Sequence, residues 1–108
     1  MNSEPELLAV TIFCANVSRS ITFYEALGVQ FDDDLHGGVG PVVIGLHPAS
    51  ERWPTTRTAI SLTVPDLGLV TAALDALGVP WESVEGLSGK VIRTSDPVGS
   101  RVLLAQRV

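Results

Sequence analysis

The sequence predicts one α+β domain over residues 1–108, built from two tandem strand–helix–strands modules at 6–50 and 57–107. The first reason is an internal repeat: Ala26-Leu27-Gly28-Val29 falls on Ala76-Leu77-Gly78-Val79, at an offset of 50 residues (78 − 28). The second reason is that each copy starts with a strand-like alternation and continues with a helical pattern that ends at the shared glycine. At 108 residues, 45% of them hydrophobic, the chain has enough material for one core but not for two.

The first module opens with a strand whose apolar face consists of Val10, Ile12 and Cys14. A helix follows, with Asn16 as its N-cap and Gly28 as the left-handed residue at its end. Its apolar positions recur at helical spacing, namely Ile21, Tyr24 and Leu27.

Two further strands are predicted in this module, near 29–33 and 42–47. The segment between them, 34–40, is rich in glycine and is expected to be a loop, so this copy has lost or shortened one strand. Residues 49–56 are expected to link the copies, with prolines at positions 48 and 54 near Trp53.

The second module repeats the pattern, with Ile60, Leu62 and Val64 on the apolar face of its first strand. Pro65-Asp66 starts its helix, which stops at Gly78. Three strands are then expected, near 79–84, 89–94 and 101–105, with Asp96-Pro97-Val98-Gly99 as the turn before the last.

Composition argues against several kinds of protein. A formal charge of −5 disfavours a nucleic-acid partner and mildly favours cationic ligands. No apolar run approaches the ~20 residues of a membrane span, and the acidic start does not resemble a signal peptide. A single cysteine, Cys14, fits a reducing cytoplasm, which is the expected location.

Two motifs resemble the vicinal oxygen chelate superfamily, which includes glyoxalase I, extradiol dioxygenases and bleomycin-resistance proteins. They are the run from Asn16 to Tyr24 with the following Leu27-Gly28, and the turn Asp96-Pro97-Val98-Gly99-Ser100. This resemblance implies βαβββ-type modules that curl into a mixed β-sheet cup with helices outside. It also implies a homodimer. It says little about the reaction, because one fold of this kind hosts many activities.

In metal-dependent members of that superfamily, four strand residues bind a divalent cation. The resemblance puts these positions on Ala9, Gly45, Ala59 and Leu103. None of these residues has a side-chain nitrogen or oxygen to offer a metal. We therefore expect no metal and no other cofactor, and we favour a protein that is not an enzyme.

If Ala9 and Ala59 point into the cup, strand alternation and the nearby aromatic and basic residues suggest which side chains a ligand would meet. Tryptophan could stack on a flat ligand, and arginine could meet an anionic group. The alternative is that these side chains simply fill a small cup. The candidates are Thr11, Phe13, Val43, His47, Trp53, Ser61, Thr63, Trp81, Arg93, Arg101 and Leu103.

Three other features receive no functional role. His36 is expected in the glycine-rich loop, and Cys14 is expected to be a buried, inert thiol. Asp32-Asp33-Asp34 lacks the ligand spacing of a calcium loop and is interpreted as a solvated turn.

The leading functional hypothesis is a metal-independent protein that binds a small molecule and sequesters an antibiotic or another aromatic or cationic compound. One alternative is a superfamily enzyme (a lyase, isomerase or dioxygenase) with a divalent metal site elsewhere. Another is a non-catalytic interaction domain whose cup is filled.

Overall fold

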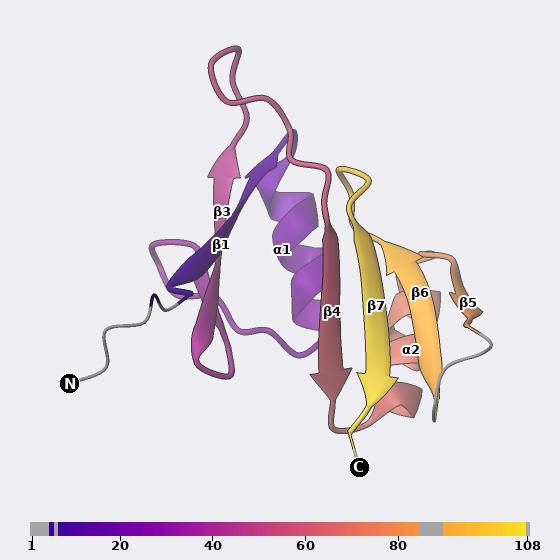
Figure 1. Cartoon of the computed structure of the whole chain (residues 1–108). Coiled ribbons are helices and arrows are strands. Elements are labelled where there is room, and N and C mark those ends of the chain that lie inside the picture. The colour runs from indigo at the N-terminus through magenta and orange to yellow at the C-terminus, as the bar shows by residue number, and fades with distance from the viewer. Residues whose placement is uncertain (1–4, 6, 85–89, 108) are drawn as a thin grey trace.

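The computed structural model describes residues 5, 7–84 and 90–107. The first module contains β1 (Ala9–Cys14), α1 (Val17–Ala26), β2 (His36–Val39) and β3 (Val42–Pro48). The second contains β4 (Ala59–Val64), α2 (Leu67–Ala76), β5 (Trp81–Ser83), β6 (Val91–Ser95) and β7 (Arg101–Gln106). The α+β fold with two related modules is therefore confirmed (Figure 1).

Each module forms its own mixed sheet with the same plan. Sheet A has the order β1-β3-β2, with β1 parallel to β3 and β2 antiparallel to it. Sheet B has the order β4-β7-β6-β5, with β4 parallel to β7 and the remaining pairs antiparallel. The first and last strands of each module thus lie side by side, as an internal repeat requires.

Both helices begin and end as the sequence predicts. The side chains of Asn16 and Asp66 cap α1 and α2 by accepting the backbone N–H of Arg19 and Leu69, each at 3.1 Å. At the other ends, Gly28 and Gly78 have φ angles of 101° and 71°, in the left-handed region where glycine is favoured. Each described helix has ten residues and lacks the length and apolar character to cross a membrane.

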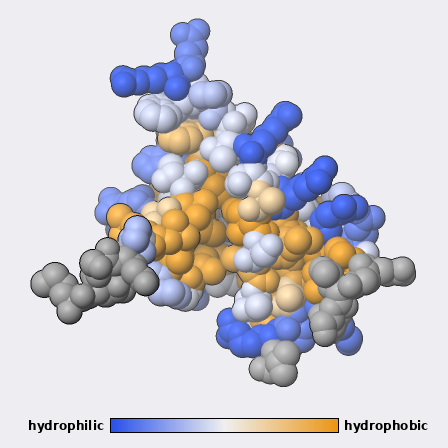
Figure 2. All heavy atoms as spheres, viewed as in Figure 1, coloured by the Kyte–Doolittle hydropathy of each residue, from blue (hydrophilic) through white to orange (hydrophobic). Residues whose placement is uncertain are grey.

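The helices cover one face of the sheets and leave the other uncovered. In Figure 1, α1 and α2 lie behind the sheets, and the strands face the viewer. The buried side chains of β1, such as Ile12 and Cys14, point towards the helices, as expected. Figure 2 shows apolar side chains across the middle of the opposite face, with hydrophilic ones towards its rim. We call this uncovered surface the open face.

The glycine-rich segment of the first module departs from the expectation. It was expected to be a loop, but His36–Val39 forms β2, and the expected strand at 29–33 is reduced to a single bridge between Phe31 and Gly37. Glycine has little strand propensity, so this segment is a strand because it pairs with β3. The first module is shortened, but at a different strand from the one expected.

The strands of the second module are close to the predicted positions. β5 is shorter than the predicted 79–84, while β6 and β7 match the predictions near 89–94 and 101–105. Gly89, at the start of one predicted strand, lies outside the described residues. Gly99 has a φ of 94° and donates its N–H to the carbonyl of Asp96, which closes the predicted turn.

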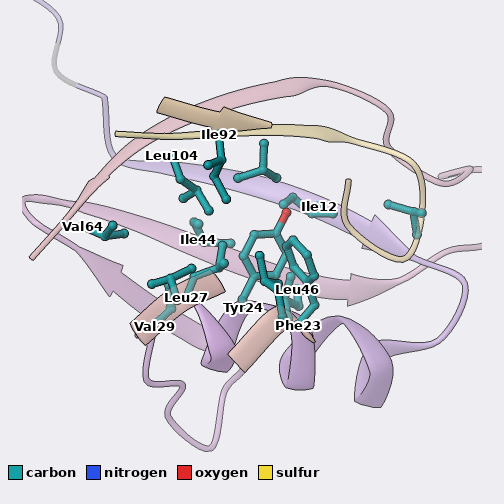
Figure 3. Close-up of a cluster of buried hydrophobic side chains, with 14 of the residues drawn as sticks. Ile12, Phe23, Tyr24, Leu27, Val29, Ile44, Leu46, Val64, Ile92 and Leu104 are labelled. Carbon is teal, nitrogen blue, oxygen red and sulfur yellow. The ribbon is translucent and has the colours of Figure 1, made fainter. Parts of the chain in front are cut away.

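One hydrophobic core joins the two modules. Figure 3 shows Phe23 and Tyr24 of α1 in the same cluster as Ile92 of β6 and Leu104 of β7. The Tyr24 ring packs edge-on against Phe23 at a centroid distance of 5.0 Å. Because residues from both copies fill one cluster, we infer that neither module has a complete core of its own.

A buried hydrogen bond ties the modules together inside this core. The Tyr24 hydroxyl donates to Oδ2 of Asp96 at 2.7 Å, and both residues are buried. Burial, and then the hydrogen bond to Asp96, raises the pKa of Tyr24 far above its usual range, so the hydroxyl keeps its proton. The other oxygen of Asp96, Oδ1, accepts the N–H groups of Val98 and Ser100 at 3.1 and 2.8 Å. One carboxylate therefore holds both a helix of the first module and a turn of the second.

We predict that Tyr24→Phe lowers the free energy of unfolding by about 2 kcal/mol, because it leaves an oxygen of the buried Asp96 without its donor. Guanidinium denaturation would measure the change. The control is Thr22→Ala, which removes an exposed hydroxyl bonded to the carbonyl of Ser18 and should change stability by less than about 0.5 kcal/mol. Equal effects of the two substitutions would contradict the role given to Tyr24.

Two neighbouring glycines of β2, Gly37 and Gly38, give a second prediction. A Cβ on Gly37 would collide with the buried Val29 and stand 3.0 Å from the ring of Phe31, so Gly37→Ala should cost about 1–3 kcal/mol. A Cβ on Gly38 would meet nothing within 4 Å, so Gly38→Ala should be tolerated. Thermal unfolding of both variants would test this. A flexible loop at 34–40 would instead tolerate both substitutions equally.

Candidate ligand-binding face

The open face carries most of the side chains predicted to meet a ligand. On sheet A, Thr11 and His47 are exposed, and Phe13 and Val43 are half-buried. On sheet B, Ser61, Thr63 and Arg101 are exposed, and Leu103 is half-buried. All alternate with core residues such as Ile12, Ile44 and Leu104, so they point away from the helices.

An aromatic pair stands at one end of this face. The rings of Phe13 and Trp53 are nearly parallel, with an interplanar angle of 9° and a centroid distance of 5.4 Å. The ring of His47 is also close to Phe13, at a centroid distance of 6.0 Å. The structure therefore brings together three predicted site residues from β1, β3 and the segment between the modules.

Backbone hydrogen bonds hold both members of the pair. The N–H of Phe13 donates to Oγ1 of Thr56, and the N–H of Thr56 donates to the carbonyl of Phe13, both at 3.0 Å. Trp53 closes a tight turn with Ser50, whose N–H donates to the Trp53 carbonyl at 2.8 Å. Trp53 is nevertheless 53% exposed, and the guanidinium of Arg52 lies 6.0 Å from its ring. An exposed, fixed indole of this kind offers a flat surface for stacking.

Sheet B presents a different chemistry. Arg101 and the hydroxyls of Ser61 and Thr63 are exposed there and are available to polar groups. Arg93 forms an ion pair with Glu82 on the neighbouring strand, so its charge is already partly compensated. Sheet A is thus the aromatic half of the open face, and sheet B is the polar half.

Trp81 does not lie on the open face, where it was expected. It pairs across the sheet with Thr94, which is buried towards α2. Its indole N–H donates to Oδ1 of Asp75 on α2 at 2.8 Å. Trp81 therefore lies on the helix side of the sheet, where Asp75 accepts the hydrogen bond of its indole N–H, the only polar group of its side chain.

His36 belongs to the open face, although no role was expected for it. In β2 it lies opposite Gly45, and its ring is 6.5 Å from that of His47, centroid to centroid. The signal in the sequence was the Val39-Gly40-Pro41-Val42 turn, where Gly40 has a φ of 57° and joins β2 to β3. A hairpin at that place would have put His36 and His47 on neighbouring strands.

The four residues at which the resemblance places metal ligands do not fit a divalent cation. Gly45 lies opposite Thr11 and Leu103 lies opposite Ser61, so the two sheets place these positions equivalently. With Ala9 and Ala59 they contribute no side-chain nitrogen or oxygen. Within residues 5, 7–84 and 90–107, no three His, Cys, Asp or Glu side chains gather as a metal site would require.

Cys14 is fully buried on the helix side of β1. Burial raises the pKa of its thiol, which reduces the thiolate fraction at neutral pH. Such a thiol is a poor nucleophile. Its position agrees with the expectation of a packing role.

Two hollows of the described chain lie beside the helices. One of about 350 Å³ runs between α1 and the turn after β6 and includes Arg19, Phe23 and Leu77. Another of about 610 Å³ lies beside α2 and includes Trp81, Lys90 and Gln106. Phe13, His47 and Trp53 line neither of these two hollows.

Matches to solved structures identify the fold of this chain, whereas sequence comparisons find no relative. No protein-family model matches the chain, and no curated protein matches it in sequence. The solved structure of TnmS3, an antibiotic binding protein from Streptomyces sp. CB03234, superposes with a TM-score of 0.79 at 17% identity and covers 100% of both chains. A glyoxalase/bleomycin resistance protein from the same source has a TM-score of 0.70 at 19% identity, over 94% of this chain and 100% of the other.

The same fold also occurs in enzymes. A lactoylglutathione lyase from Agrobacterium tumefaciens matches with a TM-score of 0.70 at 12% identity, over 97% of this chain and 96% of the other. This chain therefore has the glyoxalase/bleomycin-resistance fold, as the two sequence motifs predicted. At these identities the matches show the fold only, and function has to be argued from the open face.

Proposed function

We propose that this protein is a member of the glyoxalase/bleomycin-resistance superfamily that binds a flat aromatic small molecule without a metal and sequesters it. The observation that carries the proposal is the Phe13–Trp53 pair on the open face. The missing donors at Ala9, Gly45, Ala59 and Leu103 also favour binding over metal-dependent turnover. TnmS3, which has the same fold, is an antibiotic binding protein, and an antibiotic is therefore a reasonable ligand class here.

The formal charge of −5 favours a cationic ligand over an anionic one. Charge attraction mainly raises the association rate, while stacking on an indole provides orientation and affinity. Arg101 on sheet B would favour a ligand with a separate acceptor group. Proflavine, a flat cation, and anthraquinone-2-sulfonate, a flat anion, therefore make a matched pair of probes.

We expect proflavine to stabilise the protein in a thermal-shift titration more than anthraquinone-2-sulfonate does. Trp53→Ala should weaken proflavine binding about tenfold, because one aromatic stacking contact is worth about 1 kcal/mol or slightly more. Trp81→Phe is the matched control, since Trp81 faces α2, and it should leave the affinity unchanged. Equal losses in both variants, or turnover of the methylglyoxal–glutathione adduct, would contradict the proposal.

We further propose that the protein works as a homodimer in which the open face is covered by a second copy. The support is the uncovered apolar surface in Figure 2, together with Leu7 and Leu8, which are 66% and 83% exposed just before β1. Exposed apolar patches of this kind usually mark a contact surface. A second copy over the open face would also convert a broad surface into an enclosed site.

Light scattering during size-exclusion chromatography should give a mass near twice 11.4 kDa at micromolar concentration. Leu8→Lys should shift the equilibrium towards the monomer, because it places a charge in the apolar contact. Leu69→Lys, at an exposed leucine on α2, is the control and should leave the mass unchanged. A monomer for the unmodified protein at every concentration would contradict the dimer.

A further inference from the structure

The two histidines of the chain lie together, although they are eleven residues apart (47 − 36). His36 of β2 is the cross-strand partner of Gly45, and His47 stands two residues beyond Gly45 on β3. All three positions therefore belong to the same face of the sheet. The two rings are inclined at 70° to each other.

Gly45 provides the space in which the imidazoles meet. A Cβ built on Gly45 would stand 3.6 Å from Nε2 of His36 and 3.8 Å from Nε2 of His47. The two nitrogens therefore border the same small volume above the glycine. Any larger residue at this position would occupy that volume, and Gly45 is itself buried beneath the rings.

A carboxylate stands behind one of the imidazoles. Oδ1 of Asp32 lies 4.0 Å from Nδ1 of His36. The same oxygen accepts the N–H groups of Asp34 and His36, each at 2.9 Å, so its position is fixed by the backbone. This carboxylate therefore places a fixed negative charge beside His36, which favours the binding of a cation there.

We propose that His36 and His47 form a two-histidine chelate for a late first-row divalent metal ion, with Cu²⁺ bound most tightly. Imidazole nitrogen suits these ions, and the order of affinities places Cu²⁺ first. Both side chains are exposed, so the two rings can rotate towards each other to form metal–nitrogen bonds of about 2.0–2.1 Å. Water fills the remaining coordination positions of the ion.

The site borders Gly45, one of the four positions at which the resemblance places metal ligands, but its ligands are two histidines that occupy none of those positions. It also does not depend on the proposed ligand function, because that function rests on the stacked rings of Phe13 and Trp53, which are not ligands of the metal. His47 stands between Phe13 and His36, so the two sites are neighbours on sheet A.

The test is a calorimetric titration of untagged protein with Cu²⁺, together with electron paramagnetic resonance of the loaded protein. We expect one tight Cu²⁺ per chain with hyperfine coupling to imidazole nitrogen. His36→Asn and His47→Asn should each weaken binding at least about tenfold, because each removes one of two ligands. The double variant gives the background from the chain terminus and the carboxylates. Wild-type affinity no tighter than that of the double variant would overturn the proposal, as would an unchanged affinity in either single variant.

A second pair of variants tests the space above Gly45 while keeping both histidines. Gly45→Ala places a methyl group 3.6 and 3.8 Å from the two Nε2 atoms and should weaken Cu²⁺ binding at least about fivefold. Gly38→Ala, on the same face of the same hairpin, has nothing within 4 Å of its Cβ and should bind like the wild type. Tighter or equal binding by Gly45→Ala would show that the histidines do not converge there. If that variant does not fold, the histidine variants still decide the question.

Discussion

The hydrogen bond between Tyr24 and Asp96 is the contact that makes one domain out of two similar halves. It links α1 of the first module to the turn before β7, across 72 residues of sequence. Asp96 is buried, and its two oxygens accept three hydrogen bonds, from Tyr24, Val98 and Ser100. A buried carboxylate with donors at both oxygens is tolerated, whereas one that loses a donor is costly.

The same network continues outwards to the candidate site. Next to Asp96, the hydroxyl of Ser100 donates to the carbonyl of Thr56 and accepts the N–H of Thr58, both at 3.1 Å. Thr56 in turn exchanges two hydrogen bonds with Phe13. A continuous series of contacts therefore leads from the core to the aromatic pair. The position of the Phe13 ring is set by the same interactions that join the modules.

The sequence predicts the repeat, both helices with their caps, and the core face of each first strand, because each of these depends on local periodicity and capping. It does not predict β2, because two glycines carry no apolar pattern and only the pairing with β3 makes that segment a strand. The side on which Trp81 lies depends on the register of a three-residue edge strand and on Asp75 of the helix. The meeting of His36 and His47 follows from the missed hairpin. The bond between Tyr24 and Asp96 joins positions too far apart for any local pattern to reveal.

The shared core also constrains how this sequence can change over time. Among the described residues, Tyr24 is the only hydrogen-bond donor to Oδ2 of the buried Asp96. A substitution at either of these two positions therefore changes which side chain is stable at the other. The two positions are epistatic, and exchanges should be tolerated in pairs. The two modules are therefore not independent of each other: a change at Tyr24 in one calls for a matching change at Asp96 in the other.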